Sequence, residues 1–241
     1  MRIAPAPISR LASFGPLLLV LAADVACADG VVVDRVYDPY VHPLETEIEW
    51  RSIVQFDDED PDVDKHAIGV GRSLSDRWAI EVYAVGIRSG DESLRPDAYE
   101  VELKRQLTEQ GEYAFDWGAL LEVERTADDD IWEVAASIMA ARDVGRWTGT
   151  MNLGLIYEWG SGVQNEVESE LRLQTRYRLR ESVEPALELH IGQDVAVIGP
   201  TLSGLVRLAP GKKFRWDAGA FWAANERSPD RVFRLNLEYE F

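Results

Sequence analysis

Apolar and polar residues alternate along segment after segment of this 241-residue chain. In residues 231–241, one face consists of Phe233, Leu235, Leu237, Tyr239 and Phe241. Charged and amide side chains occupy the positions between them. Successive side chains of a β-strand point to opposite faces, so this pattern predicts a strand with one apolar and one polar face. Residues 44–56 and 167–179 repeat the pattern, which predicts an all-β fold.

The alternation predicts about twelve strands. They are expected at 44–56, 65–73, 77–89, 98–107, 113–125, 131–142, 147–159, 167–179, 185–193, 200–209, 214–223 and 231–241. Two segments fit the strand pattern least well. The alanines of 131–142 also suit a helix, and Pro200 stands at the start of 200–209.

Connections after the odd-numbered strands are mostly long and acidic, and those after the even-numbered strands are mostly short. Transmembrane barrels show such a difference between their two ends, together with aromatic girdles at both membrane interfaces. The candidate girdle residues are Trp78, Trp117, Trp147 and Trp216 after short turns, and Trp132, Trp159 and Trp222 beside long loops. We therefore predict a closed antiparallel transmembrane β-barrel, an up-and-down meander, over residues 44–241. The alternative is a soluble β-sandwich or lipocalin-like carrier with these tryptophans in its core.

The first 28 residues differ from the rest of the chain. Arg2 and Arg10 precede a short apolar run, and an Ala-x-Ala pattern ends at Ala28. These features predict a signal peptide over 1–28, cleaved near Ala28 on export. Lipidation at Cys27 is the alternative, which Asp24 fits poorly. Residues 29–43 would then form either a simple lead-in or, through Tyr37 and Tyr40, a plug of the barrel.

A sheet in hydrocarbon must close on itself, so the last strand is expected to pair with the first. The stretch "LNLEYEF", which contains Tyr239 and Phe241, resembles the C-terminal signature of Gram-negative outer-membrane β-barrel proteins. This resemblance implies a location in the cell outer membrane, in contact with outer-membrane lipid and lipopolysaccharide. It also implies that the barrel-assembly machinery recognises the C-terminal strand.

The polar strand faces would line the lumen of such a barrel. The candidate lumen residues are Glu47, Glu49, Arg51, Glu102, Lys104, Glu122, Arg172, Arg176, Glu188, His190, Arg207 and Arg234. Eight strands leave a filled interior and sixteen leave a water channel, so twelve allow either a narrow pore or a closed lumen. Charged linings set selectivity in pores. The predicted function is a narrow channel or transporter for small polar solutes.

A barrel enzyme of the lipase, deacylase or protease type is the alternative from another functional class. His190 lies near Glu188, and Ser203 on the next predicted strand is a candidate partner. No complete catalytic set, cofactor-binding motif or metal-ligating Cys/His cluster stands out in the sequence. The net charge of −18 argues against a nucleic-acid partner.

Residues 57–64, "DDEDPDVD", concentrate carboxylates in one predicted loop. Such a run is typical of a solvated loop. The functional alternative is a divalent cation held by carboxylate oxygens, bridging the loop to lipopolysaccharide.

Overall fold

The computed structural model describes residues 33–58 and 61–241. The predicted signal peptide and residues 29–32 lie outside the described residues. The described part contains twelve strands. They are β1 (Thr46–Phe56), β2 (Val63–Ser75), β3 (Trp78–Ser89), β4 (Arg95–Gln106), β5 (Asp116–Thr126), β6 (Ile131–Val144), β7 (Trp147–Gly160), β8 (Glu166–Tyr177), β9 (Glu184–Ile191), β10 (Ala196–Ala209), β11 (Lys212–Ala223) and β12 (Arg231–Glu240).

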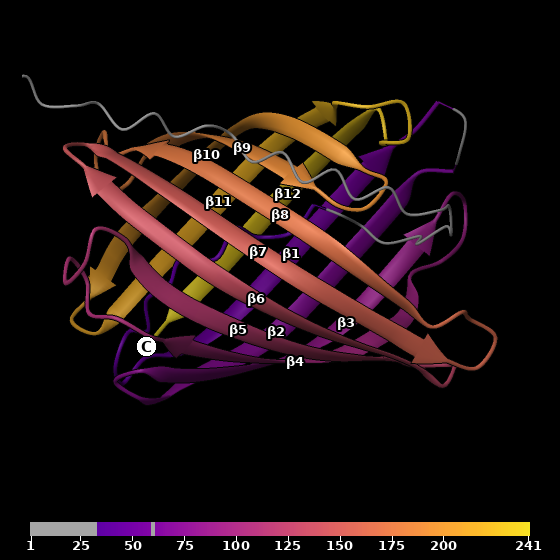
Figure 1. The fold of residues 1–241 in the computed structure, drawn as a ribbon, viewed down its shortest axis with the longest axis horizontal. Helices are drawn as coiled ribbons and strands as arrows, with labels where there is room; N and C mark the ends of the chain where they lie inside the picture. The colour runs from indigo at the N-terminus through magenta and orange to yellow at the C-terminus, as the bar shows by residue number, and fades with distance from the viewer. Residues whose placement is uncertain (1–32, 59–60) are drawn as a thin grey trace, which may run out of the picture. The chain divides into compact units, whose positions relative to one another are not determined.

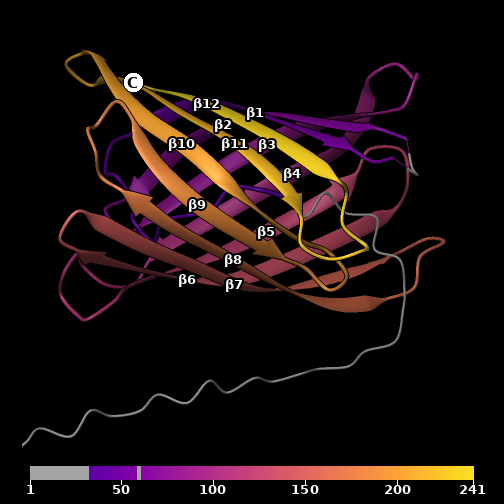
Figure 2. The same cartoon turned by 90° about the horizontal axis from the view of Figure 1, so that it is seen from above.

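Each strand pairs antiparallel with its neighbours in the sequence, and β12 pairs with β1, so the sheet is a closed up-and-down barrel (Figures 1 and 2). At this seam Glu47 lies opposite Glu240 and Phe56 lies opposite Arg231. Thr46 and Phe241 extend the seam by one step, because each donates its backbone N–H to the carbonyl of the other, at 3.3 and 2.8 Å. The predicted fold class and the pairing of first and last strands are confirmed. Closure leaves no strand edge unpaired, as hydrocarbon requires.

The barrel has two ends, which we name by their connections. The loop end carries 57–62, 90–94, 127–130, 161–165, 192–195 and 224–230, and the turn end carries 76–77, 107–115, 145–146, 178–183 and 210–211. The C-terminus lies at the turn end (Figure 1). The turn-end connections are not uniformly short, since 107–115 is longer than was expected between the fourth and fifth strands. Within the described residues, no helix is long and apolar enough to cross a membrane.

Strand β10 begins at Ala196, four residues before its predicted start, and contains Pro200. Proline has no N–H to donate to a sheet ladder. Pro200 lies opposite Leu187 of β9, while the pairing of β10 with β11 has no partners for Gly199 and Pro200. The strand therefore continues through the proline because the interruption is confined to one of its two ladders.

Strand β6 is fully extended, although its alanines also suit a helix. Its inward residues Ala135, Met139 and Ala141 are buried, with Met139 completely so. Met139 packs with Leu120 of β5 and with Tyr37, a residue of the N-terminal segment. The small inward side chains of β6 thus leave room in the lumen for that segment.

The two faces of the sheet differ as the alternation predicts. Outward positions carry a band of exposed apolar side chains, among them Ile68, Val70, Leu121, Leu153 and Leu155. Inward positions carry most of the buried charged and polar side chains, including Glu49, Arg51, Glu102, Glu188 and Arg234. Lipid-facing strands of membrane barrels have this arrangement of an apolar outside and a polar inside.

Candidate functional site: the lumen

Residues 33–43, which precede β1, run through the lumen from the loop end to the turn end. Val33 packs among Ile53, Val197, Phe221 and Val232 near the loop end. At the turn end the backbone N–H of Val41 donates to Gln106 at 2.9 Å, and the hydroxyl of Tyr40 donates to Asp116 at 2.7 Å. We call residues 33–43 the lumen segment.

Tyr37 fixes the middle of the lumen segment. Its N–H donates to the side-chain oxygen of Asn152 at 2.8 Å, and the amide of Asn152 donates to the carbonyl of Tyr37 at 2.8 Å. Its hydroxyl donates to Glu102 at 2.8 Å and accepts from Arg51 at 3.0 Å. These partners lie on β7, β4 and β1, and Tyr37 is only 2% exposed. The residue therefore crosses the lumen, with its backbone bound to β7 and its side chain bound to β4 and β1.

Asp34 and Arg35 add charged contacts to the same segment. The carboxylate of Asp34 lies 3.0 Å from Arg172 and 3.7 Å from Arg51. The guanidinium of Arg35 lies 3.2 Å from Glu49 and 3.3 Å from Glu238. These two charges of the segment thus meet opposite charge on the barrel wall, which offsets the cost of burying them.

Arg51 links the lumen segment to the wall of β1, β3 and β4. Its guanidinium binds Glu49 at 3.2 Å, Glu102 at 3.0 Å and the hydroxyl of Tyr83 at 2.7 Å. The same group lies 4.2 Å from the centre of the Tyr83 ring. Arg51 is buried, so these partners satisfy a charge that water does not reach.

A second polar network occupies the wall of β8–β12. Glu188 accepts from Arg234 at 2.9 Å, from Gln174 at 2.7 Å and from Thr201 at 3.1 Å, and it lies 3.0 Å from His190. His190 is completely buried, with its ring edge-on to Phe221. The histidine therefore lies in a packed wall away from open solvent.

Ser203 does not lie opposite His190, contrary to the prediction of a paired serine. The register of β9 and β10 places Val197 opposite His190 and Glu184 opposite Ser203. Ser203 instead lines a cavity of about 300 Å³ in the turn-end half of the lumen, together with Arg35, Arg176 and Glu238. The described residues thus bring no serine to His190.

The candidate lumen residues fall into two groups. Those on the inward face are Glu47, Glu49, Arg51, Glu102, Lys104, Glu122, Arg172, Arg176, Glu188, His190 and Arg234. Arg207 has the inward alternation of β10 but lies at the turn-end rim, where its exposed guanidinium donates to Glu181 at 3.0 Å. This hydrogen bond lowers the pKa of Glu181, a turn residue outside the strands. Alternation gives the face of a residue but not its height in the barrel.

Glutamates form a continuous arc across five strands in the loop-end half of the lumen. The register places Glu100 opposite Glu124, Glu124 opposite Glu133, Glu133 opposite Glu158 and Glu158 opposite Glu166. We call these five residues the glutamate arc. Lys65 of β2 reaches the arc, with its ammonium 3.8 Å from Glu124. Like charges directly opposite one another repel, so the arc favours cations in the lumen.

One member of the arc, Glu100, also belongs to a cluster of carboxylates. Oxygens of Glu100, Glu102 and Glu122 lie within 4.8 Å of one another, a spacing that suits a cation. The prediction for residues 57–64 concerned a different cluster. There Asp64 pairs with Arg88, the backbone N–H of Asp58 donates to Asp230 at 3.0 Å, and residues 59 and 60 lie outside the described part.

The candidate girdle tryptophans occupy outward positions at both ends. Trp78, Trp117, Trp147 and Trp216 lie toward the turn end, and Trp132, Trp159 and Trp222 lie toward the loop end. The rings of Trp132 and Trp159 stack with their centres 6.4 Å apart, and the ring centres of Trp147 and Tyr177 are 4.9 Å apart. Trp50 differs, because it faces outward near the middle of β1 and stacks on His66. At the C-terminus, the rings of Tyr239 and Phe241 stack at 5.7 Å.

Several contacts in the lumen were not among the candidate sites. Asp34 and Arg35 precede the alternating region, so no periodic signal marked them. Asn152, Gln106 and Tyr83 looked like ordinary strand residues, and only the path of the lumen segment makes them partners of it or of Arg51. Lys65 gave no signal beyond its position in a predicted strand.

No protein-family model matches this sequence, and no curated protein matches it. Solved structures do match. An outer membrane channel from Pseudomonas putida F1 is 15% identical, with a TM-score of 0.57 over 86% of this chain and 98% of that one. The KdgM porin in complex with disordered oligogalacturonate is 9% identical, with a TM-score of 0.55 over 81% and 99%. The β domain of the Bordetella autotransporter BrkA is 14% identical, with a TM-score of 0.54 over 81% and 98%. This chain thus has the fold of outer-membrane β-barrel proteins.

Proposed function

We propose that this chain is an outer-membrane channel for small polar solutes, that it prefers cations, and that the lumen segment closes it in the conformation described here. The glutamate arc is the observation that carries the proposal. It places carboxylates opposite one another on five neighbouring strands, at the loop end of a lumen lined with charge. Side-chain charges that line a pore select ions of opposite sign.

The glutamate arc carries an electrostatic free-energy cost, which mobile cations in the lumen would lower. Directly opposed like charges destabilise a pair of strands. Lys65 neutralises part of the arc at Glu124. Cations that enter from the loop end would reduce the remaining repulsion, which makes the arc an entry site for them.

The similar structures support an outer-membrane channel as the general function. One of them is an outer membrane channel and another is a porin in complex with oligogalacturonate. Oligogalacturonate is a polyanion, and the glutamate arc would repel it from this lumen. The proposed solutes therefore differ in charge from that ligand.

Closure by the lumen segment follows from the contacts of Tyr37, Asp34 and Arg35 with several walls. A solute that passes from end to end must displace the segment, because Tyr37 crosses the middle of the lumen. The cavity of about 300 Å³ lies on the turn-end side of this crossing. We therefore expect the wild-type channel to open rarely.

Planar-bilayer recording of the purified barrel tests the proposal. We expect brief conductance steps for the wild type and longer openings for Tyr37→Ala. In a KCl gradient, the reversal potential should lie toward the potassium equilibrium potential. The triple variant Glu124→Gln, Glu133→Gln and Glu158→Gln should move it toward zero. A silent bilayer for both the wild type and Tyr37→Ala would refute the channel.

A matched control separates local from overall charge. Glu92, Glu112 and Glu226 are exposed and lie in connections outside the lumen. Changing these three to glutamine alters the net charge by the same amount as the arc variant. We expect the reversal potential of this control to equal that of the wild type. An equal shift in both triple variants would refute the arc as the selective element.

A further inference from the structure

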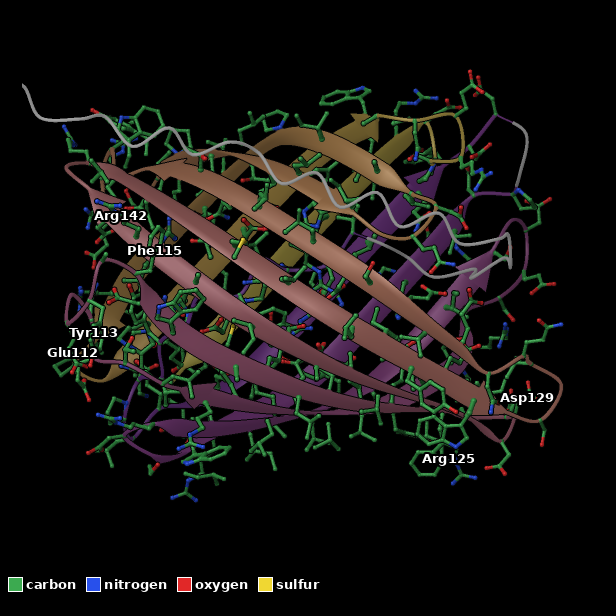
Figure 3. All side chains as sticks on the ribbon, viewed as in Figure 1. Glu112, Tyr113, Phe115, Arg125, Asp129 and Arg142 are labelled. Atoms are coloured by element: carbon green, nitrogen blue, oxygen red, sulfur yellow. The ribbon has the colours of Figure 1, made fainter. Side chains whose placement is uncertain are left out.

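The cations on the outer surface differ in their pairing at the two ends of the barrel. At the loop end, the outward arginines all have a carboxylate within 4.0 Å. The pairs are Arg88 with Asp64, Arg95 with Asp97, Arg125 with Asp130 and Arg231 with Asp58. Figure 3 labels Arg125 at this end. These guanidinium groups are therefore already neutralised by the protein itself.

The turn end carries arginines of two kinds. Arg77, Arg178 and Arg207 each have a carboxylate within 4.0 Å. Three others lie on aromatic rings and have no such partner in the described part of the chain, whereas the loop-end arginines that lie on rings keep their carboxylates. The guanidinium carbon of Arg105 is 4.9 Å from the ring centre of Trp78, and that of Arg142 is 5.3 Å from Phe115. The guanidinium carbon of Arg146 is 5.2 Å from the ring centre of Tyr177. Among the described residues, no carboxylate lies within 4.0 Å of any of the three guanidinium groups. We call Arg105, Arg142 and Arg146 the arginine collar.

The collar is accessible from outside the barrel. Arg105 and Arg142 occupy outward positions of β4 and β6, Arg146 lies in the turn between β6 and β7, and all three are exposed. Figure 3 shows Arg142 beside Phe115 at the end opposite Arg125. Aromatic residues surround them, with the exposed Phe115 in contact with Trp117 and the half-buried Tyr177 in contact with Trp147. The collar therefore lies at the level of an aromatic girdle.

The chemistry of the collar suits a phosphate group. A guanidinium whose flat face covers a ring keeps its N–H groups at the edge free to donate. Those donors match phosphate oxygens in bidentate geometry. Arg146 uses two donors on the carbonyls of Arg178 and Leu179, which hold it in place. Arg105 and Arg142 have no such hydrogen bonds among the described residues, so their donors remain available.

We propose that the arginine collar binds the phosphate of anionic phospholipid headgroups in the membrane leaflet at the turn end. Basic side chains at the edge of a membrane protein attract anionic lipid. The apolar band and the girdle tryptophans set the collar at headgroup height, which favours a lipid over a soluble anion. The inference rests on the membrane location in the proposed function, but it does not depend on conduction.

Other cations without a carboxylate partner among the described residues support this asymmetry. They include Arg180 and Lys212, which lie in or beside turn-end connections. The loop end carries Asp-rich connections and paired arginines, so it offers little free positive charge. Anionic headgroups are therefore expected at one end of the barrel only.

Lipid retention by the purified, detergent-solubilised full chain tests the proposal. The barrel is mixed with equal amounts of phosphatidylglycerol and phosphatidylcholine, washed, and analysed for bound lipid per barrel by mass spectrometry. We expect the wild type to retain phosphatidylglycerol in preference. The variant Arg105→Gln, Arg142→Gln and Arg146→Gln should retain at least about threefold less of it, because the charged phosphate contacts are lost.

The control variant Arg88→Gln, Arg95→Gln and Arg125→Gln removes the same charge from the loop end. It should retain as much phosphatidylglycerol as the wild type. The proposal would be overturned if the collar variant retained as much phosphatidylglycerol as the wild type. It would also be overturned if both triple variants lost the same amount of bound phosphatidylglycerol. Heat-dependent gel mobility reports whether each variant is folded. If the triple variant does not fold, Arg105→Gln with Arg142→Gln leaves the anchored Arg146 in place and tests the same prediction.

Discussion

Tyr37 and Asn152 exchange two hydrogen bonds of 2.8 Å across the lumen, in which a side-chain amide pairs with a backbone peptide group. A single side chain of β7 thus satisfies both the donor and the acceptor of a buried residue outside the sheet. Loss of this amide would leave two buried backbone groups without partners.

Asn152→Ala should therefore loosen the lumen segment. Leaving a buried polar group unpaired costs about 1–3 kcal/mol. We expect faster hydrogen exchange at the amide of Tyr37 and longer channel openings. Asn165→Ala is the control, because Asn165 donates to Tyr157 at an exposed position. Unchanged exchange at Tyr37 would contradict the assigned contact.

Asp34→Asn should destabilise the folded barrel. The carboxylate lies near Arg172 and Arg51, which are both buried. Because Arg172 keeps Glu170 and Arg51 keeps Glu49 and Glu102, the cost should be that of a lost hydrogen bond between charged groups, about 1.5–3 kcal/mol. Thermal unfolding in detergent measures the effect. Asp91→Asn, in an exposed connection, should leave the melting temperature unchanged.

Gly199→Ala should disturb the barrel wall where β10 passes Pro200. A Cβ at Gly199 would overlap the carbonyl oxygen of Ala220, so the backbone of β11 must move. Overpacking of this kind costs about 1–3 kcal/mol or more. Gly149→Ala is the matched control, because a Cβ there meets nothing within 4 Å. Equal melting temperatures for the two variants would refute the close approach.

Phe241→Ala should slow insertion into the outer membrane without unfolding a barrel that has already formed. Its backbone closes the seam with Thr46, and this pairing survives the substitution, while the ring only stacks on Tyr239. The measurement is the amount of heat-modifiable barrel in outer-membrane fractions. Phe233→Ala removes an aromatic ring of similar exposure from β12. An equal defect in both variants would argue against a special role of Phe241.

Arg207→Gln should raise the pKa of Glu181 toward its ordinary value. The hydrogen bond from Arg207 lowers that pKa in the folded barrel. Because the pKa of Glu181 is lower in the folded state than in the unfolded state, its ionised form stabilises the fold. This contribution is complete above the pKa of the unfolded state and is lost as the pH falls through the pKa of the folded state. NMR titration of labelled glutamate measures the shift. Because both side chains are exposed, the melting temperature should hardly change.

The sequence was sufficient to predict the strands because lipid and lumen impose opposite demands on alternate residues. Residues 231–241 show this most clearly, and the pairing of β12 with β1 followed from the need to close the sheet. The start of β10 was predicted four residues too late, at Pro200. Sequence alone does not tell which of the two hydrogen-bond ladders a proline interrupts. Residues 131–142 were ambiguous because alanines occupy both faces of the strand, which weakens the alternation of apolar and polar residues there.

The lumen was less predictable, because its contacts depend on height and register. Arg207 has an inward alternation but lies at the turn-end rim. Ser203 lies opposite Glu184 because the four-residue connection after β9 sets the register. The path of residues 33–43 had no periodic signal. Its partners are single polar side chains on separate strands. They are far apart in the sequence, so no local sequence pattern links them to residues 33–43.

The passage of residues 33–43 between the two mouths of a continuous ring constrains the order in which this molecule is built. Once β1 and β12 are joined, no gap remains through which a peptide could slip sideways into the interior. Residues 33–43 must therefore take their place before the sheet closes, or enter the closed barrel afterwards through one of its two ends. In the first case, the pairing of β1 with β12 is also the step that encloses residues 33–43.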